Sequence, residues 1–267
     1  MQPLALILQA TGTNRDQDVA QALQMAGART EIVPLNRLRF GERHFGDYQL
    51  LVLPGGFSYA DALGAGKLLA LDLQAYFADQ VRAFVACGKP VIGICNGFQA
   101  LVKSGILPAV EDPTLLAATA NGPLPQATLT FNQQGHFECR WVRLSPVSQT
   151  CLWTRGLSEI YCPVAHGEGN FVTASPAMLA ALQSASQIGL VYSTEDGKAA
   201  LGAYPANPNG SQLDIAGVCN PQGNVLGLMP HPENHILPHQ HPQWTRGERS
   251  GSGLPLFING VRFAAQL

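Results

Sequence analysis

The stretch VIGICNGFQAL, residues 91–101, passes from an apolar run into a helical pattern, with a cysteine at the turn between them. Gly93 and Gly97 flank Cys95, each two residues away. Glycines at such positions let the backbone turn sharply and let neighbouring segments approach closely. The pattern therefore predicts a strand-turn-helix elbow that presents the Cys95 side chain beyond the end of a strand.

Apolar runs like the one before Cys95 recur along the first 107 residues. They are LALIL at 4–8, TEIVPL at 30–35, YQLLVL at 48–53 and PVIGI at 90–94. Helical patterns separate them, over 14–27 and as one long helix over 64–87. Strands that are continuously apolar are typical of a parallel sheet covered on both faces. Residues 1–107 are therefore expected to form a doubly wound α/β half.

The pattern changes after residue 108. Shorter strands follow with polar residues and turns between them, at 127–132, 137–144, 159–166, 188–193, 214–220 and 224–230. Helices are expected over 175–184, with Ser175 as N-cap, and over 253–266. Residues 234–252 read as a long irregular loop rich in Pro, His and Gly. We expect one domain, residues 1–267, whose mostly parallel sheet carries a smaller antiparallel extension.

Composition excludes several classes of protein. The net charge is −2, only 13% of residues are charged, and there is no basic run to neutralise phosphates, which argues against a nucleic-acid partner. No apolar run approaches the roughly 20 residues needed to span a bilayer. The first residues lack the pattern of a secretory leader, and the six cysteines are scattered as in proteins with reduced thiols. We expect a cytoplasmic protein without a membrane partner.

A thiol nucleophile needs a base and a group that orients the base. In LMPHPEN, residues 228–234, His231 and Glu233 follow an expected strand, and alternate residues of an extended segment face the same side. The prolines beside His231 disfavour a helix there. Cys95 alone reads by default as a buried core thiol, and an isolated His-x-Glu carries little weight. Together at the ends of strands they predict a Cys95-His231-Glu233 triad.

Longer blocks carry a family resemblance. They are GGFSY at 55–59, CNGFQ at 95–99, AHGEGNF at 165–171 and MPHPE at 229–233. The sequence resembles the class I glutamine amidotransferases, and among them the glutaminase components of phosphoribosylformylglycinamidine synthases, over nearly its whole length. The resemblance is weakest over 108–158 and 234–252, and Asn234 stands where an arginine is common. It implies a flavodoxin-like, doubly wound fold.

The resemblance also implies a reaction and roles for residues. Cys95 would attack the side-chain amide of L-glutamine, giving a γ-glutamyl thioester and ammonia, with His231 moving protons and Glu233 orienting it. The remaining residues implied for the site are Gly55, Gly56 and the amide of Asn96 in the oxyanion hole, and Gln99, His166, Gly167 and Glu168 for substrate binding.

The same family pattern implies a partner. A synthetase subunit would use the ammonia and ATP to convert formylglycinamide ribonucleotide to formylglycinamidine ribonucleotide in purine biosynthesis, with a small accessory subunit in the complex. No cofactor is expected in this chain, and ATP and Mg belong to the partner. GAGKL at 64–68 lacks the spacing of a phosphate-binding loop, and the histidines at 231–241 are separated by prolines, so no metal site is expected.

Two other functions are compatible with the same residues. One is a cysteine hydrolase or stress protein of the related flavodoxin-like superfamily, which glutamine hydrolysis would distinguish. The other is a non-catalytic scaffold for a synthetase. Retention of Cys95, His231 and Glu233 argues against a scaffold, since it has no need of all three.

Overall fold

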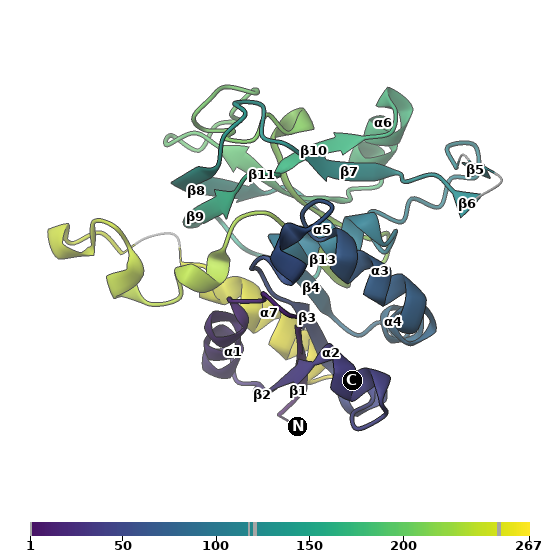
Figure 1. The fold of residues 1–267 in the computed structure, drawn as a ribbon. Helices are drawn as coiled ribbons and strands as arrows, with labels where there is room; N and C mark the ends of the chain where they lie inside the picture. Colours follow the sequence, from purple (N-terminus) through teal and green to yellow (C-terminus); the bar gives the residue numbers. More distant parts are fainter. Residues whose placement is uncertain (1, 117, 120–121, 250–251) are drawn as a thin grey trace.

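A central sheet organises the molecule in the computed structural model, which describes residues 2–116, 118–119, 122–249 and 252–267. Over these residues the sheet has nine strands in the order β2-β1-β3-β4-β13-β12-β11-β8-β9 (Figure 1). In that order they span Arg29–Pro34, Leu4–Gln9, Leu50–Leu53, Val91–Ile94, Val225–Leu228, Ile215–Cys219, Ile188–Ser193, Glu138–Pro146 and Ile160–His166.

The sheet changes direction at β13. Strands β2, β1, β3, β4 and β13 pair in parallel, and β12, β11, β8 and β9 continue the sheet through antiparallel pairs. The predicted doubly wound half and its antiparallel extension are both present, joined in one sheet. The strand β13 comes from late in the chain and lies beside β4, so the segment after β13 reaches the same sheet edge as Cys95.

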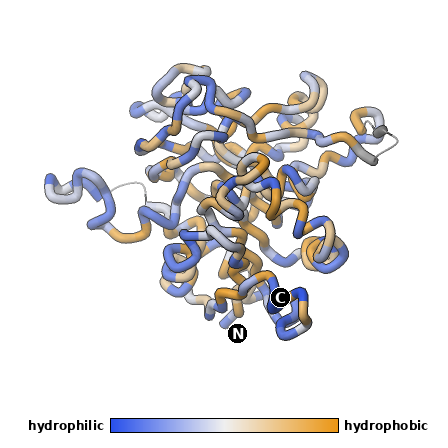
Figure 2. The backbone as a smooth tube through the Cα atoms, in the orientation of Figure 1, coloured by the Kyte–Doolittle hydropathy of each residue, from blue (hydrophilic) through white to orange (hydrophobic). Residues whose placement is uncertain are grey.

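The described residues form seven α-helices, most of which cover the two faces of the parallel half, whereas α6 packs against strand β10. They are α1 (Asp16–Met25), α2 (Leu35–Arg39), α3 (Lys67–Tyr76), α4 (Ala78–Ala86), α5 (Asn96–Lys103), α6 (Pro176–Ser184) and α7 (Leu254–Ala264). In Figure 1, α1 and α7 lie together on one side of the parallel strands, and α3 and α5 lie on the other. The strands at the centre of the parallel half are fully buried, and Figure 2 colours them mainly as hydrophobic, as expected for a sheet covered on both faces.

Two small sheets complete the fold. Strand β7 (Ala127–Thr130) pairs with β10 (Asn170–Thr173), and β5 (Ala118–Thr119) pairs with β6 (Gly122–Pro123). The β7-β10 pair packs on α5. Helix α6 begins as predicted, with the Ser175 side chain accepting a hydrogen bond from the Met178 amide at 3.1 Å. None of the helices in the described part of the chain combines the length and the apolar character needed to cross a membrane.

The prediction of one long helix over 64–87 is wrong. The structure has two helices, α3 and α4, with a break at Phe77, where φ is −128°. The Phe77 ring is buried and lies 5.6 Å from the Phe45 ring, centre to centre, so the break serves a contact with a distant segment. Helix α3 starts only at Lys67, after Gly66 in the left-handed region at φ +69°.

The irregular loop expected over 234–252 is largely present within the described residues. Its ordered pieces are short 3₁₀ turns at Pro232–Asn234, Pro238–Gln240 and Trp244–Arg246. In Figure 1 this segment extends away from the sheet. Residues 250–251 lie outside the described part.

Candidate active site

Cys95 occupies the turn between β4 and α5. Its φ of 51° and ψ of −106° place a residue with a side chain in a region that such residues seldom adopt, at a cost of about 1–3 kcal/mol. The turn is held by a hydrogen bond of 2.8 Å from the Cys95 amide to the Leu228 carbonyl of β13. The predicted elbow is therefore present, and its strain is supported by the neighbouring strand.

The two flanking glycines are required by close packing. A Cβ on Gly97 would lie 2.0 Å from the Leu53 carbonyl oxygen of β3, and one on Gly93 would lie 2.8 Å from the Gly97 carbonyl oxygen. Real Cβ atoms essentially never approach other atoms closer than 3.0 Å. The glycines thus allow α5 to lie directly against the sheet, which places Cys95 at the carboxyl edge of β4.

His231 and Glu233 form a buried pair. The Nδ1 atom of His231 is 2.7 Å from Oε1 of Glu233, and the exposed fractions of the two residues are 3% and 1%. The His231 amide donates to the Pro163 carbonyl of β9 at 2.8 Å. The expectation of an extended segment here is wrong, because Pro232–Asn234 is a 3₁₀ turn. The side chains still meet, since His231 immediately precedes the turn and Glu233 lies in its middle.

Charge couples this pair to the cysteine. Burial alone would raise the pKa of the Cys95 thiol, but the positive charge of His231 and hydrogen bonds with His166 and His231 lower that pKa to about 6. Burial would lower the pKa of His231, but the charges of Glu233 and Cys95 raise that pKa to about 10. The two shifts agree, and they describe a thiolate-imidazolium pair near neutral pH.

A cavity of about 190 Å³ opens beside Cys95. Five other residues expected for the site line it: Gly56, Gln99, His166, Gly167 and Glu168. Gly55 lies behind it against the His231 ring, where a Cβ would be 2.7 Å from Cε1. The aromatic side chains of Phe57, Phe131 and Phe137 form part of its wall. The structure therefore places Cys95 and five of the other predicted residues around one small hollow, with Gly55 behind it.

A hydrogen bond joins Gln99 to Glu168, and Glu168 also contacts the segment before α3. The Gln99 side-chain amide donates to the Glu168 carbonyl at 2.6 Å. The Glu168 carboxylate accepts from the Ala65 amide at 3.2 Å and lies 3.5 Å from the Lys103 ammonium group. The carboxylate of Glu168 is thus committed to the segment before α3 and to Lys103, while His166, Gly167 and Glu168 all line the cavity.

The Asn96 side chain makes contacts that sequence reasoning did not anticipate. Its Oδ1 accepts from the Ser58 amide at 3.1 Å, and its Nδ2 donates to the Asp61 carboxylate at 2.8 Å. Burial raises the pKa of Asp61, with the charge of Glu168 adding to this, against the hydrogen bond from Asn96. Asn96 therefore fastens the segment after Gly56 to the helix that carries Cys95. Polar residues in the GGFSY and CNGFQ blocks were the only hint in the sequence.

The other side of this segment is held by the backbone after β1. The Phe57 amide donates to the Gly12 carbonyl at 3.0 Å, and the Tyr59 amide donates to the Thr11 carbonyl at 2.6 Å. The Arg15 amide donates to the Gly55 carbonyl at 3.3 Å. The glycine turn expected to form the oxyanion hole is therefore fixed from two sides.

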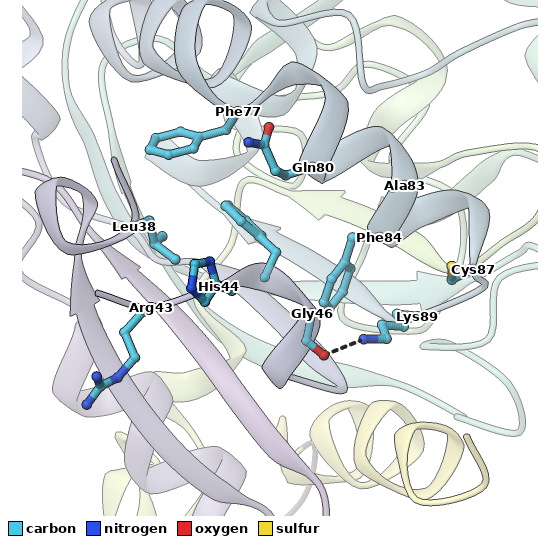
Figure 3. Close-up of a pocket in the computed structure, with 11 residues that line it drawn as sticks. Leu38, Arg43, His44, Gly46, Phe77, Gln80, Ala83, Phe84, Cys87 and Lys89 are labelled. Atoms are coloured by element: carbon cyan, nitrogen blue, oxygen red, sulfur yellow. Dashed lines mark hydrogen bonds between the residues drawn. The ribbon is translucent and has the colours of Figure 1, made fainter. Parts of the chain in front are cut away.

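A second hollow, of about 320 Å³, lies between residues 43–46 and α4. Figure 3 shows Leu38, Phe77 and Phe84 around it, and Lys89 donating to the Gly46 carbonyl at 3.4 Å. These segments precede β3 and β4, so this hollow lies at the opposite edge of the sheet from Cys95. No pair like His231 and Glu233 lines it.

Metal binding finds no support in the described ranges, where no group of three His, Cys, Asp or Glu side chains is placed to hold an ion. The His235 and His241 rings instead pack against aromatic rings of β8 and β9. His235 lies 5.3 Å from the Trp141 ring, and His241 lies 5.2 Å from the Tyr161 ring, centre to centre.

Comparisons with known proteins identify relatives of the whole chain. A family model for CobB/CobQ-like glutamine amidotransferase domains matches residues 2–264. Phosphoribosylformylglycinamidine synthase subunit PurQ of Treponema denticola is 54% identical over 268 residues, which cover 98% of this chain and 99% of the relative. The subunit of the same name from Dehalococcoides mccartyi is 41% identical, and each chain is covered to 98%.

Solved structures extend the comparison to the fold. A chain in the structure of PurLQS from Thermotoga maritima has a TM-score of 0.71 and 29% identity, covering 98% of this chain and 99% of that one. A glutamine amidotransferase from the same organism has a TM-score of 0.53 at 15% identity, with 98% of this chain and 97% of that one covered. The second likeness concerns the fold alone. The resemblance and the fold expected from the sequence are both confirmed.

Proposed function

The chain belongs to the family of CobB/CobQ-like glutamine amidotransferase domains, and on that premise we propose that it is the glutaminase subunit of a phosphoribosylformylglycinamidine synthase. The observation that carries the proposal is the 54% identity to a PurQ subunit over nearly the whole of both chains. The buried Cys95, His231 and Glu233 support the chemistry, because a glutaminase of this kind needs an ionised thiol beside a protonated base.

Hydrolysis begins at the amide of L-glutamine, bound in the cavity beside Cys95. The thiolate attacks the amide carbon, a C–S bond forms, and the carbonyl electron pair moves to oxygen. The His231 imidazolium then gives its proton to the nitrogen as the C–N bond breaks, releasing ammonia and leaving a γ-glutamyl thioester. Glu233 holds His231 Nδ1 at 2.7 Å, so the other ring nitrogen, Nε2, is available to the reacting groups.

The oxyanion is stabilised by backbone amides in this proposal. Asn96 is the first residue of α5, so its amide has no partner within the helix, and the amides of Gly55 and Gly56 lie in the fixed turn across from it. Water then attacks the thioester, neutral His231 takes its proton, and glutamate leaves as the thiolate returns. Gln99, His166, Gly167 and Glu168 surround the rest of the substrate.

The ammonia serves a partner. A synthetase subunit, which holds ATP and Mg, uses it to convert formylglycinamide ribonucleotide to formylglycinamidine ribonucleotide. The likeness to a chain of PurLQS from Thermotoga maritima supports a complex with such a subunit. A small accessory subunit is a further part of the proposal. We propose that residues 1–267 act as one domain, which the single family match and the continuous sheet support. A cytoplasmic location follows from the pathway.

The experiment is to measure glutamate release by the purified chain alone and after adding the synthetase subunit loaded with ATP and formylglycinamide ribonucleotide. We expect a low rate alone and an increase of about a hundredfold in the complex, which is the effect of aligning one oxyanion donor. Equal rates in both states would contradict the coupling. As a control, the complex containing Cys95→Ala should still form product from added ammonia, because the synthetase chemistry lies on the other chain.

A further inference from the structure

A second imidazole lies at the Cys95 site, at the carboxyl end of β9. His166 is buried, with 3% of its surface exposed, and it lines the same cavity as Cys95. Its Nε2 atom is 2.7 Å from Oδ1 of Asn209, a side chain that is fully buried. A Cβ on Gly169 would lie 2.3 Å from His166 Nε2, so a glycine at that position makes the ring orientation possible.

The hydrogen bonds of Asn209 determine which nitrogen of His166 carries a proton. The Asn209 Nδ2 group donates to the Gly169 carbonyl at 3.0 Å and to the Tyr192 hydroxyl at 2.7 Å. A carbonyl oxygen can only accept, so the orientation of this amide is fixed and its Oδ1 faces His166. Oδ1 is also only an acceptor, so His166 Nε2 must donate. In the neutral ring, Nδ1 then carries a lone pair.

That lone pair has no other use among the described residues. His166 Nδ1 is buried and makes no hydrogen bond of ordinary geometry with a protein group. A buried ring nitrogen without a partner is uncommon and needs an explanation. Cys95 lines the same cavity as His166, and burial raises the pKa of its thiol while His231 first and His166 next lower that pKa.

We propose that His166, oriented by Asn209, is a second proton acceptor for the Cys95 thiol. The S–H bond breaks with its electron pair left on sulfur, and an N–H bond forms at Nδ1, so that a thiolate and an imidazolium replace two neutral groups. This acceptor keeps Cys95 ionised in those molecules in which His231 is neutral. The inference rests on the proposed role of Cys95 as the nucleophile, and it gives the His166 ring a function beyond lining the substrate cavity.

Other titratable groups surround the two rings and the thiol. They are Glu233 beside His231, the buried Glu138 of β8 opposite His166 in the strand register, Asp61 and Glu168 on the cavity wall, and Tyr192 and Cys162 in the core behind. Glu138 is paired with Arg140. Burial raises the pKa of both Tyr192 and Cys162, so neither competes for the thiol proton near neutral pH. The carboxylates of Asp61 and Glu168 accept hydrogen bonds from Asn96 and from the Ala65 amide.

The test compares alkylation of Cys95 by iodoacetamide between pH 5 and 10 in His231→Ala and in His231→Ala/His166→Gln. Glutamine can keep the hydrogen bond to Asn209, but it cannot take up a proton. We expect the double variant to react about tenfold more slowly at pH 7, which corresponds to one unit in the thiol pKa. His44→Gln in the same background, an exposed histidine, should change nothing. Equal rates with and without His166 would overturn the proposal.

Nitrogen NMR of histidine in the unmodified chain gives a second test that needs no substitution. Neutral His166 should carry its proton on Nε2, and blocking Cys95 with iodoacetamide should shift its Nδ1 signal. A proton on Nδ1 of the neutral ring, or a signal indifferent to the blocked thiol, would refute the proposal. Neither experiment needs glutamine or the synthetase. A negative result here would therefore refute the role of His166 and leave the proposed function standing. The proposed function is tested separately, by glutamate release in the complex.

Discussion

Gly97→Ala tests whether the close approach of α5 to the sheet is what positions the nucleophile. The new Cβ would lie 2.0 Å from the Leu53 carbonyl oxygen and 2.8 Å from the Leu53 Cβ, whereas ordinary contact begins at 3.4 Å. The difference between 3.4 and 2.0 Å means that α5 must move by about 1.4 Å. Leu53 lies in strand β3, which is paired on both sides with β1 and β4, so we expect the helix rather than the strand to give way.

Two effects follow from that movement. Overpacking a core costs about 1–3 kcal/mol, and contact with backbone places this substitution at the upper end. For a chain of this size, this corresponds to a loss of about 5–10 °C in melting temperature. The helix carries Cys95 at its start, and a misplacement of about 1 Å can reduce a rate by about a hundredfold. We therefore expect both a lower melting temperature and a loss of glutamine hydrolysis in the complex.

The assay pairs thermal unfolding with glutamate release, and the control is Gly46→Ala. A Cβ added at Gly46 would meet no other atom within 4 Å, so alanine fits there without a clash. The reasoning is refuted if Gly97→Ala melts within about 1 °C of Gly46→Ala, well inside the shift expected from overpacking. An unchanged rate with a lower melting temperature would separate stability from positioning, and would show that α5 returns Cys95 to its place.

Three further outcomes are expected. Cys95→Ala should abolish glutamine-dependent ammonia release while the chain still folds, and a glutamine-analogue electrophile should label Cys95 and none of the other cysteines. The rate at which this electrophile inactivates the unmodified chain should rise as pH rises through about 6, where the Cys95 thiol ionises. The rate should fall as pH approaches about 10, where His231 loses its proton. A rate still rising above pH 10 contradicts the ion pair. Asn96→Ala should lower kcat by about tenfold or more with a smaller change in KM, because the turn at Ser58 loses its hydrogen bond to α5. The measurement is steady-state glutamate release by the complex. A change confined to KM would instead assign Asn96 to substrate binding.

Patterns local to a segment predicted most of the parallel half. Continuous Leu, Ile and Val runs fit buried strands covered on both faces, and the glycines around Cys95 have meaning only at a sharp turn with close packing. The same reasoning failed at Phe77, because the helix breaks there to bury a ring against Phe45, and nothing within residues 64–87 records that distant partner. A contact between segments leaves no local periodicity.

In the candidate site, too, contacts between near neighbours in sequence could be predicted and contacts between distant segments could not. His231 and Glu233 are two residues apart, so their pairing could be predicted, although the reason given was wrong: a 3₁₀ turn rather than an extended strand brings them together. Proline is compatible with both conformations, so Pro230 and Pro232 do not distinguish an extended segment from a 3₁₀ turn. The Asn96 contact with Ser58 joins residues 38 apart, and the Asn209 contact with His166 joins residues 43 apart. No local sequence pattern predicts these contacts, because the residues are far apart in the chain and meet only in the folded protein.

The segment that follows the glycine turn is strained. Tyr59, Ala60 and Asp61 all have positive φ values, of 55°, 56° and 52°, a conformation that persists only where surrounding contacts impose it. The backbone of residues 11–15 imposes it on one side, and Asn96 imposes it on the other. Phe57, at the edge of this turn, is 46% exposed beside the cavity mouth. If the proposed synthetase subunit contacts Phe57, it will act on a strained segment next to the glycines proposed for the oxyanion hole, and docking and hydrolysis will then share one structural element.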